Sequence, residues 1–110
     1  MADVMADRRE APRYALILAA EVLDIASGAK LNARSSDVSR TGCYIDTLNP
    51  VPLGSQVKVQ LRSADGVFEA EAKVAYVCPG LGMGLHWGVN VAPEKLVLLD
   101  RWLAEAARNV

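Results

Sequence analysis

The chain is poor in the residues from which metal and redox sites are built. Its 110 residues include two cysteines and one histidine. Cys43 and Cys78 are far apart, form no CxxC pair and have only His86 as a further candidate ligand, so we expect no metal site. Both cysteines lie in apolar, strand-like segments, which favours reduced thiols in the protein core.

The chain also lacks a strong net charge and a long apolar run. Twelve Lys and Arg residues stand against thirteen Asp and Glu residues, so no overall field draws the protein to DNA, RNA or an anionic membrane. No apolar run approaches the roughly 20 residues that cross a bilayer. Residues 1–10 contain no apolar segment typical of a secretory signal. We therefore expect a cytoplasmic protein that does not insert into a membrane.

The hydrophobic fraction of 52% is enough for the core of one domain. Alternation of apolar and polar residues predicts about six strands. The clearest are residues 56–62, with Val57, Val59 and Leu61 facing inward, and residues 67–77. In the second strand the expected inner face consists of Phe68, Ala70, Ala72, Val74 and Tyr76. Asp65 and Gly66, between the two strands, predict a hairpin turn.

The remaining strands have weaker patterns. Residues 14–25 are typical of a strand with both faces partly covered, since Leu18 and Val22 lie on one face and Ile17 on the other. We expect further strands over 30–39, 43–47 and 85–91, with glycine-rich residues 78–84 as a turn. After Pro93 the spacing becomes helical. The expected buried face is Leu96, Leu99, Leu103 and Ala106, with Trp102 and Val110 at its margins. Short strands followed by one helix predict a small barrel or sandwich that the helix covers.

Three arginines, Arg8, Arg9 and Arg13, lie within six residues just before the first strand. Taken alone, such a cluster is most often a solvated tail. Guanidinium groups also bind phosphates through two parallel hydrogen bonds and stack on planar bases. The cluster therefore predicts a phosphate or nucleotide site only if a second group elsewhere in the chain completes it.

That second group is found in "SDVSRTGCYI", residues 36–45. Asp37 and Ser39 are two residues apart and would share one face of a strand. Gly42 permits a tight turn or the close approach of a ligand. A carboxylate beside a hydroxyl suits the N–H groups of a guanine edge. The alternative is local turn chemistry, because Asp and Ser often bond their own backbone at strand ends.

Together these segments resemble the PilZ domain, a bacterial receptor for cyclic di-GMP. Arg9 and Arg13 match its R-x-x-x-R motif, residues 37–42 match D-x-S-x-x-G, and "GLGMGLHW", residues 80–87, is similar to its glycine-rich strand. The resemblance spans roughly residues 8–105. It implies a six-stranded antiparallel β-barrel of the split-barrel type with a C-terminal α-helix. We expect a disordered tail over 1–7 and one domain over 8–110, made of an arginine loop (8–13), the barrel (14–91) and the helix (93–108).

The resemblance also implies a ligand site. Arg9 and Arg13 would hold phosphates and stack on guanines, with help from Arg8. Asp37 and Ser39 would contact a guanine edge or a phosphate, and Gly42 would leave room. Further candidates at the edge of this set are Arg40, Gly84 and Trp87. In the family the arginine loop closes over the ligand, which changes the surface that is offered to a partner.

The implied function is a cyclic di-GMP receptor that regulates an unidentified protein effector in motility, biofilm formation, exopolysaccharide synthesis or secretion. The alternative is a PilZ-type interaction module that does not bind the dinucleotide. We expect no enzyme and no cofactor, because no nucleophile with its base and no phosphate loop is recognised. A single-stranded nucleic-acid binder would need a basic groove with exposed aromatics, which this composition does not favour. The last helix also offers a face for a partner or a second copy of the chain.

Overall fold

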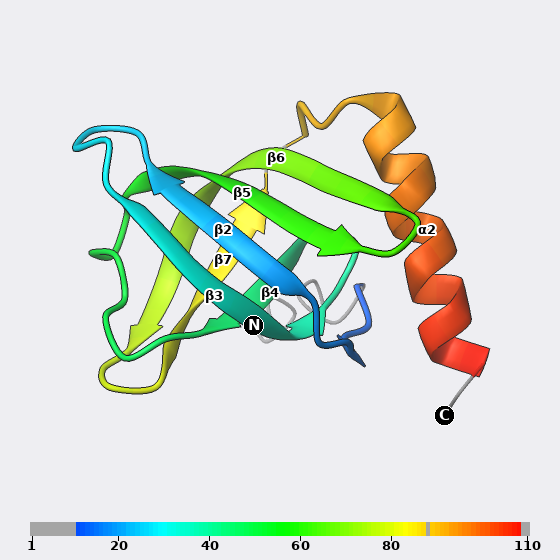
Figure 1. The fold of residues 1–110 in the computed structure, drawn as a ribbon, viewed down its shortest axis with the longest axis horizontal. Coiled ribbons are helices and arrows are strands. Elements are labelled where there is room, and N and C mark those ends of the chain that lie inside the picture. Colours follow the sequence, from blue (N-terminus) through cyan, green and yellow to red (C-terminus); the bar gives the residue numbers. More distant parts are fainter. Residues whose placement is uncertain (1–10, 88, 109–110) are drawn as a thin grey trace, which may run out of the picture.

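The chain forms a barrel, which is one of the two architectures that the alternating pattern allows and the one that the family resemblance implies. The computed structural model describes residues 11–87 and 89–108. Its elements are β1 (Tyr14–Ala15), β2 (Ala19–Asp24), β3 (Lys30–Val38), β4 (Gly42–Asp46), β5 (Gln56–Ser63), β6 (Gly66–Cys78), β7 (Gly82–Trp87) and α2 (Pro93–Arg108). Strands β2 to β7 pair in the order β3-β2-β5-β6-β7-β4, and β4 pairs back to β3 (Figure 1). This closes a six-stranded antiparallel barrel, with β1 as an extra strand on β3.

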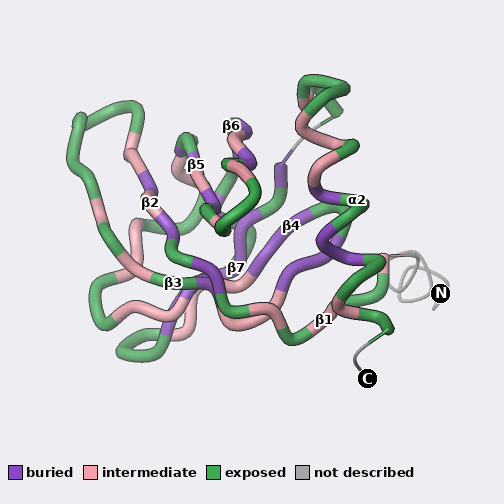
Figure 2. Tube along the Cα trace, turned by 45° about the vertical axis from the view of Figure 1, so that its right-hand side comes forward, coloured by how far each residue is buried: buried purple, intermediate pink, exposed green. Residues whose placement is uncertain are grey.

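The core lies inside the barrel, where the buried positions of the strands meet (Figure 2). The expected inward residues of β5 are fully buried, as is Phe68 of β6, whose ring packs on Trp87 with centroids 4.8 Å apart. Because side chains fill a barrel of this size, a ligand has to bind on its outside. Both cysteines are free thiols, Cys43 buried and Cys78 half-buried, and burial raises the pKa of Cys43.

The segment 14–25 forms two strands, so the expectation of one strand with two covered faces is wrong. The chain leaves the sheet after Ala15 and re-enters it at Ala19. The buried hydroxyl of Ser35 makes this break possible, since it accepts a hydrogen bond from Leu18 N and donates one to Leu16 O. Ile17 then projects outward and is 67% exposed.

Two further departures arise in the strands that carry the candidate site. The last strand is Gly82–Trp87, so Gly82 and Gly84, expected in a turn, belong to β7. The strand expected over 85–91 is wrong at its C-terminal end, since residues 89–91 lie outside the sheet. In β6, Val74 pairs with Leu85 but Tyr76 pairs with Gly84, which leaves Ala75 without a partner. Such a bulge shifts the alternation by one residue. Tyr76, expected on the inner face, is therefore 37% exposed on the outside.

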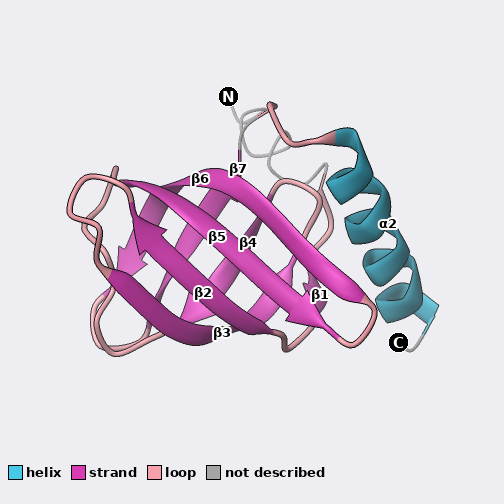
Figure 3. Ribbon diagram, turned by 45° about the horizontal axis from the view of Figure 1, so that its top comes forward, coloured by secondary structure: helices cyan, strands magenta, loops and turns pink. Residues whose placement is uncertain are grey.

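Helix α2 lies against one end of the barrel, beside the β5–β6 hairpin (Figure 3). It buries Leu99 and Leu103 as its spacing predicts, and Leu96 and Ala106 are half-buried. Trp102, expected at the margin, is only 4% exposed. Its indole N–H donates to Asp65 Oδ1 at 2.9 Å, which gives the buried ring the polar partner that it needs. The turn between β5 and β6 therefore also anchors the helix.

Asp65→Asn is expected to lower the melting temperature at neutral pH but much less in acid. Hydrogen bonds from Ser63 and then from Trp102 lower the pKa of Asp65 in the folded protein. A carboxyl with a lowered folded pKa stabilises the fold above its unfolded pKa of about 3.9, and this contribution is lost as the pH falls below that value. Thermal unfolding followed by circular dichroism at about pH 7 and about pH 3 measures the difference. An equal loss at both pH values would show that the charge of Asp65 does not matter.

Candidate functional site

The candidate site is built on a row of four residues that crosses the outer face of the barrel. Asp37 of β3 pairs with Tyr44 of β4, Tyr44 with Gly84 of β7, and Gly84 with Tyr76 of β6. We call these four residues the outer row. A second bulge contributes to it, because Ser35 pairs with Ile45 and Asp37 with Tyr44, which leaves Ser36 unmatched.

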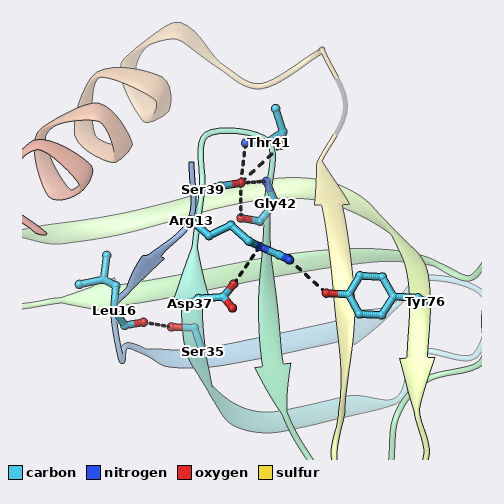
Figure 4. A network of polar contacts seen from close by, with 8 residues as sticks. All are labelled: Arg13, Leu16, Ser35, Asp37, Ser39, Thr41, Gly42 and Tyr76. Carbon is cyan, nitrogen blue, oxygen red and sulfur yellow. Dashed lines mark hydrogen bonds and ion pairs between the residues drawn. The ribbon is translucent and has the colours of Figure 1, made fainter. Parts of the chain in front are cut away.

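Arg13 lies across the outer row and joins its two ends (Figure 4). One terminal nitrogen, Nη2, donates a hydrogen bond to the Tyr76 hydroxyl at 3.2 Å, and Nε lies 3.4 Å from Asp37 Oδ1. The hydrogen bond to Tyr76, more than the negative charge of Asp37, raises the pKa of Arg13. The structure thus brings one arginine of the R-x-x-x-R motif to the aspartate of the D-x-S-x-x-G motif.

The Asp37 carboxylate is incompletely satisfied in this arrangement. Its Oδ1 is shielded from water and accepts no hydrogen bond from any of the described residues. Arg13 is close enough for an ion pair, but the geometry is not that of a hydrogen bond. A buried carboxylate oxygen without a donor is energetically costly. Asp37 Oδ1 can therefore accept from a ligand N–H group only if the groups that shield it, including Arg13, move aside.

Ser39 has a different environment from Asp37, so the prediction that they share a strand face is wrong. β3 ends at Val38, and the chain turns there. The Ser39 hydroxyl is buried within this turn, where it accepts from the backbone N–H groups of Thr41 and Gly42, each at 3.2 Å, and donates to Gly42 O. These are the contacts expected of a residue that stabilises the turn.

Gly42 and Gly84 both allow close packing. A Cβ at Gly42 would lie 2.1 Å from the backbone oxygen of Leu85, so only glycine lets β4 approach β7 there. A Cβ at Gly84 would lie 2.2 Å from the ring of Tyr76, and one at Gly82 would lie 2.7 Å from the ring of Tyr44. The two tyrosine rings therefore occupy the space above the glycines of β7.

The tyrosine pair, Tyr44 and Tyr76, is the part of this surface that sequence reasoning missed. The ring centroids are 6.1 Å apart, with 32° between the ring planes. A hydrogen bond with Cys78, followed by burial, raises the pKa of Tyr44 to about 12. A signal was available, because alternate glycines on one strand can mark a place where a neighbouring group crosses it closely.

The other candidate residues are placed as follows. Arg8 and Arg9 lie outside the described residues. Arg40, in the β3–β4 turn, forms an ion pair with Asp100 of α2 at 2.9 Å. Trp87 is buried in the barrel wall, and its indole N–H donates to Arg40 O at 2.8 Å. Arg40 and Trp87 thus connect the β3–β4 turn, which contains the end of the D-x-S-x-x-G motif and is called the motif turn, to the barrel and the helix.

Two hollows lie nearby, and neither is lined by Arg13, Asp37 or Tyr76. One, of about 350 Å³, is lined by Arg40, Thr41, Trp87, Val89, Val91 and Leu96. The other, of about 440 Å³, is lined by Gln56, Glu71, Ala72, Lys73, His86 and Asn90. Across residues 11–87 and 89–108, no cluster of three or more potential metal ligands is found. Over the same residues, no helix has the length and apolar character to span a membrane.

Solved structures with the same fold include two longer chains and one isolated domain. MotI (DgrA), an inhibitor of motility from Bacillus subtilis, superposes with a TM-score of 0.76 at 16% identity, covering 93% of this chain and 52% of its own. YcgR from Escherichia coli, solved in complex with c-di-GMP, gives 0.76 at 19% identity, covering 93% and 47%. This chain therefore spans about half the length of either protein.

The PilZ domain of YcgR with c-di-GMP gives a TM-score of 0.72 at 18% identity and covers 93% of both chains. At these identities the likeness concerns the fold. No curated protein matches the sequence. The family model described as the PilZ domain matches residues 7–105, nearly the whole chain. With both motifs meeting at one place on a six-stranded barrel, the chain belongs to the PilZ domain family.

Proposed function

We propose that this chain is a cyclic di-GMP receptor domain whose ligand binds on the outer row of the barrel. The observation that carries the proposal is the ion pair between Arg13 and Asp37, which joins the two motifs at one surface. The solved complexes of YcgR with c-di-GMP support this assignment through the shared fold. Cyclic di-GMP combines two phosphates with two guanines, and this surface presents a guanidinium beside a carboxylate.

Each group has a role that its chemistry suits. Arg13 remains charged and can donate two parallel hydrogen bonds to a phosphate. Arg9, with Arg8 beside it, supplies the further positive charges that a doubly charged ligand requires. The Oδ1 atom of Asp37, which lacks a donor among the described residues, accepts from the N–H edge of a guanine once Arg13 moves to the phosphate. Ser39 and Gly42 contribute mainly by fixing the turn that follows Asp37.

The output is a change of shape rather than a reaction. A phosphate that takes up Arg13 competes with Asp37 and Tyr76 for the same guanidinium, so binding exchanges contacts within the site. The ligand favours whichever arrangement it binds better, and this shift alters the surface that an effector protein contacts. The likeness to an inhibitor of motility makes control of motility the first process to examine.

One observation favours the alternative of an interaction module that does not bind the dinucleotide. Arg13 is already partnered by Asp37 and Tyr76, so the ligand has to offer more than these contacts provide. Titration of the folded protein with cyclic di-GMP separates the two functions. Selective binding over GTP and cyclic GMP supports the receptor, whereas no binding would leave the interaction module.

Arg13→Ala is expected to weaken cyclic di-GMP binding by roughly 10- to 100-fold, the loss of one charge-assisted contact. Isothermal titration calorimetry measures the change. The matched control is Arg62→Ala, because Arg62 is also a half-exposed arginine in an ion pair, with Glu21 at 3.6 Å, but lies on β5. The control should bind as the wild type does. Equal affinities for wild type and Arg13→Ala would place the ligand elsewhere.

Ser39→Ala is expected to reduce the free energy of unfolding by about 1–3 kcal/mol, because its buried hydroxyl bonds three backbone groups of the turn. Urea unfolding followed by tryptophan fluorescence measures the loss. If the variant keeps the stability of the wild type but loses affinity for cyclic di-GMP, Ser39 contacts the ligand directly and the turn role is wrong.

A further inference from the structure

We propose that Tyr44 and Tyr76, which belong to neither sequence motif, form the surface on which a guanine base of the ligand stacks. This inference rests on the proposed function, because it assigns residues to the same site. It differs in its physical basis, since the motifs provide charge and hydrogen bonds, whereas the tyrosine pair provides a planar apolar surface. Nothing in the spacing of the motifs points to either tyrosine.

The first support is the position of Tyr76. In a regular strand it would follow Val74 into the barrel, but the bulge at Ala75 turns it to the outer face. There it meets Tyr44, which faces outward between the buried residues Cys43 and Ile45. The bulge therefore places the Tyr76 side chain on the outer row instead of in the core.

The second support is the absence of side chains under the rings. Gly82 and Gly84 both lie on β7, between the strands of the two tyrosines, and a Cβ at either position would collide with a ring. The Tyr76 ring lies over Gly84, yet 37% of the residue is exposed, so the side facing away from the strand is open. A planar base can pack on such a ring face.

The third support is the set of polar groups at the edge of this surface. Arg13 contacts Tyr76 through the hydroxyl at the ring's edge (Figure 4). Asp37, at the other end of the outer row, has an oxygen that accepts no hydrogen bond from the described residues. A guanine stacked on the tyrosine pair would direct its N–H edge toward a carboxylate and leave the arginine for the phosphate.

A purely structural role is the competing explanation, because aromatic rings over glycines also stabilise sheets. The two roles differ in what each substitution removes. Tyr76→Phe removes the hydroxyl bond to Arg13 but keeps the ring, whereas Tyr76→Leu removes the ring as well. The same pair of substitutions at Tyr44 tests the second ring. Circular dichroism melting of every variant reports any loss of fold separately from binding.

The experiment measures affinity for cyclic di-GMP by calorimetry and the guanine H8 resonance of the bound ligand by NMR. Stacking on an aromatic ring moves H8 upfield through the ring current. We expect Tyr76→Leu to weaken binding roughly ten-fold or more relative to Tyr76→Phe, with loss of the upfield shift. Equal affinity and an unchanged H8 position for the folded Phe and Leu variants at both positions would overturn the proposal.

A second variant tests the surface without removing a tyrosine. Gly84→Ala places a methyl group where the Tyr76 ring lies, so the ring has to move. It should reduce both the affinity and the H8 shift, and retention of both in a folded variant would contradict the stacking role.

The nucleotide 5′-GMP is titrated as a separate probe of the base alone. If the wild type fails to bind cyclic di-GMP but shifts H8 of GMP in a way that depends on the rings, the receptor function is wrong and the stacking surface stands. If neither nucleotide responds, both proposals are wrong.

Discussion

Two bulge residues, Ser36 without a partner in β4 and Ala75 without a partner in β7, bring Asp37 and Tyr76 to the outer face of the barrel. A strand alternates strictly, so a single extra residue reverses the direction of everything that follows it until the pairing ends. The bulge in β6 takes Tyr76 out of the core. The bulge in β3 lets the buried Ser35 and Val38 stand three residues apart, with Asp37 between them on the outer row. Without both, Arg13 would have nothing to bridge.

The guanidinium of Arg13 contacts the two residues that the bulges bring to the outer face. Arg13 contacts both ends of the outer row, so one guanidinium connects Asp37 of β3 with Tyr76 of β6. Its side chain is partly exposed, which keeps the energetic value of the ion pair with Asp37 small and sensitive to salt. A weak ion pair suits the proposed receptor function, because a bound phosphate would replace it.

Local signals predicted most of the strands, the C-terminal helix and the regions of the motifs, whereas the choice of a barrel over a sandwich came from the family resemblance. Alternation in β5 and the first half of β6, and the turn at Asp65, are read from neighbouring residues. The break after Ala15 could not be predicted, because it depends on the hydroxyl of Ser35, which is distant in sequence. The two bulges were likewise missed, since nothing local distinguishes Ala75 from its neighbours. Only pairing with β7 identifies it as the extra residue.

The same limit explains the site residues. Arg13 and Asp37 are close together as their motifs suggest, whereas Ser39 lies in the turn because β3 stops one residue before it. Trp102 is buried at the edge of the predicted apolar face of the helix, and only the contact with Asp65 shows how its indole N–H is satisfied there. In each case the missing information was a tertiary partner rather than a propensity.

The attachment of α2 has a consequence for the order in which the protein forms during synthesis. Three successive helix residues contact two separate turns of the barrel, Asp100 with Arg40, and Arg101 and Trp102 with Asp65. The helix follows the barrel in the chain, so it leaves the ribosome after every strand has done so. All strands of the barrel can pair before the helix has been synthesised. The β3–β4 and β5–β6 turns are connected to each other only after residues 100–102 have been added. A nascent barrel therefore presents its motif turn before the helix that holds that turn in place exists.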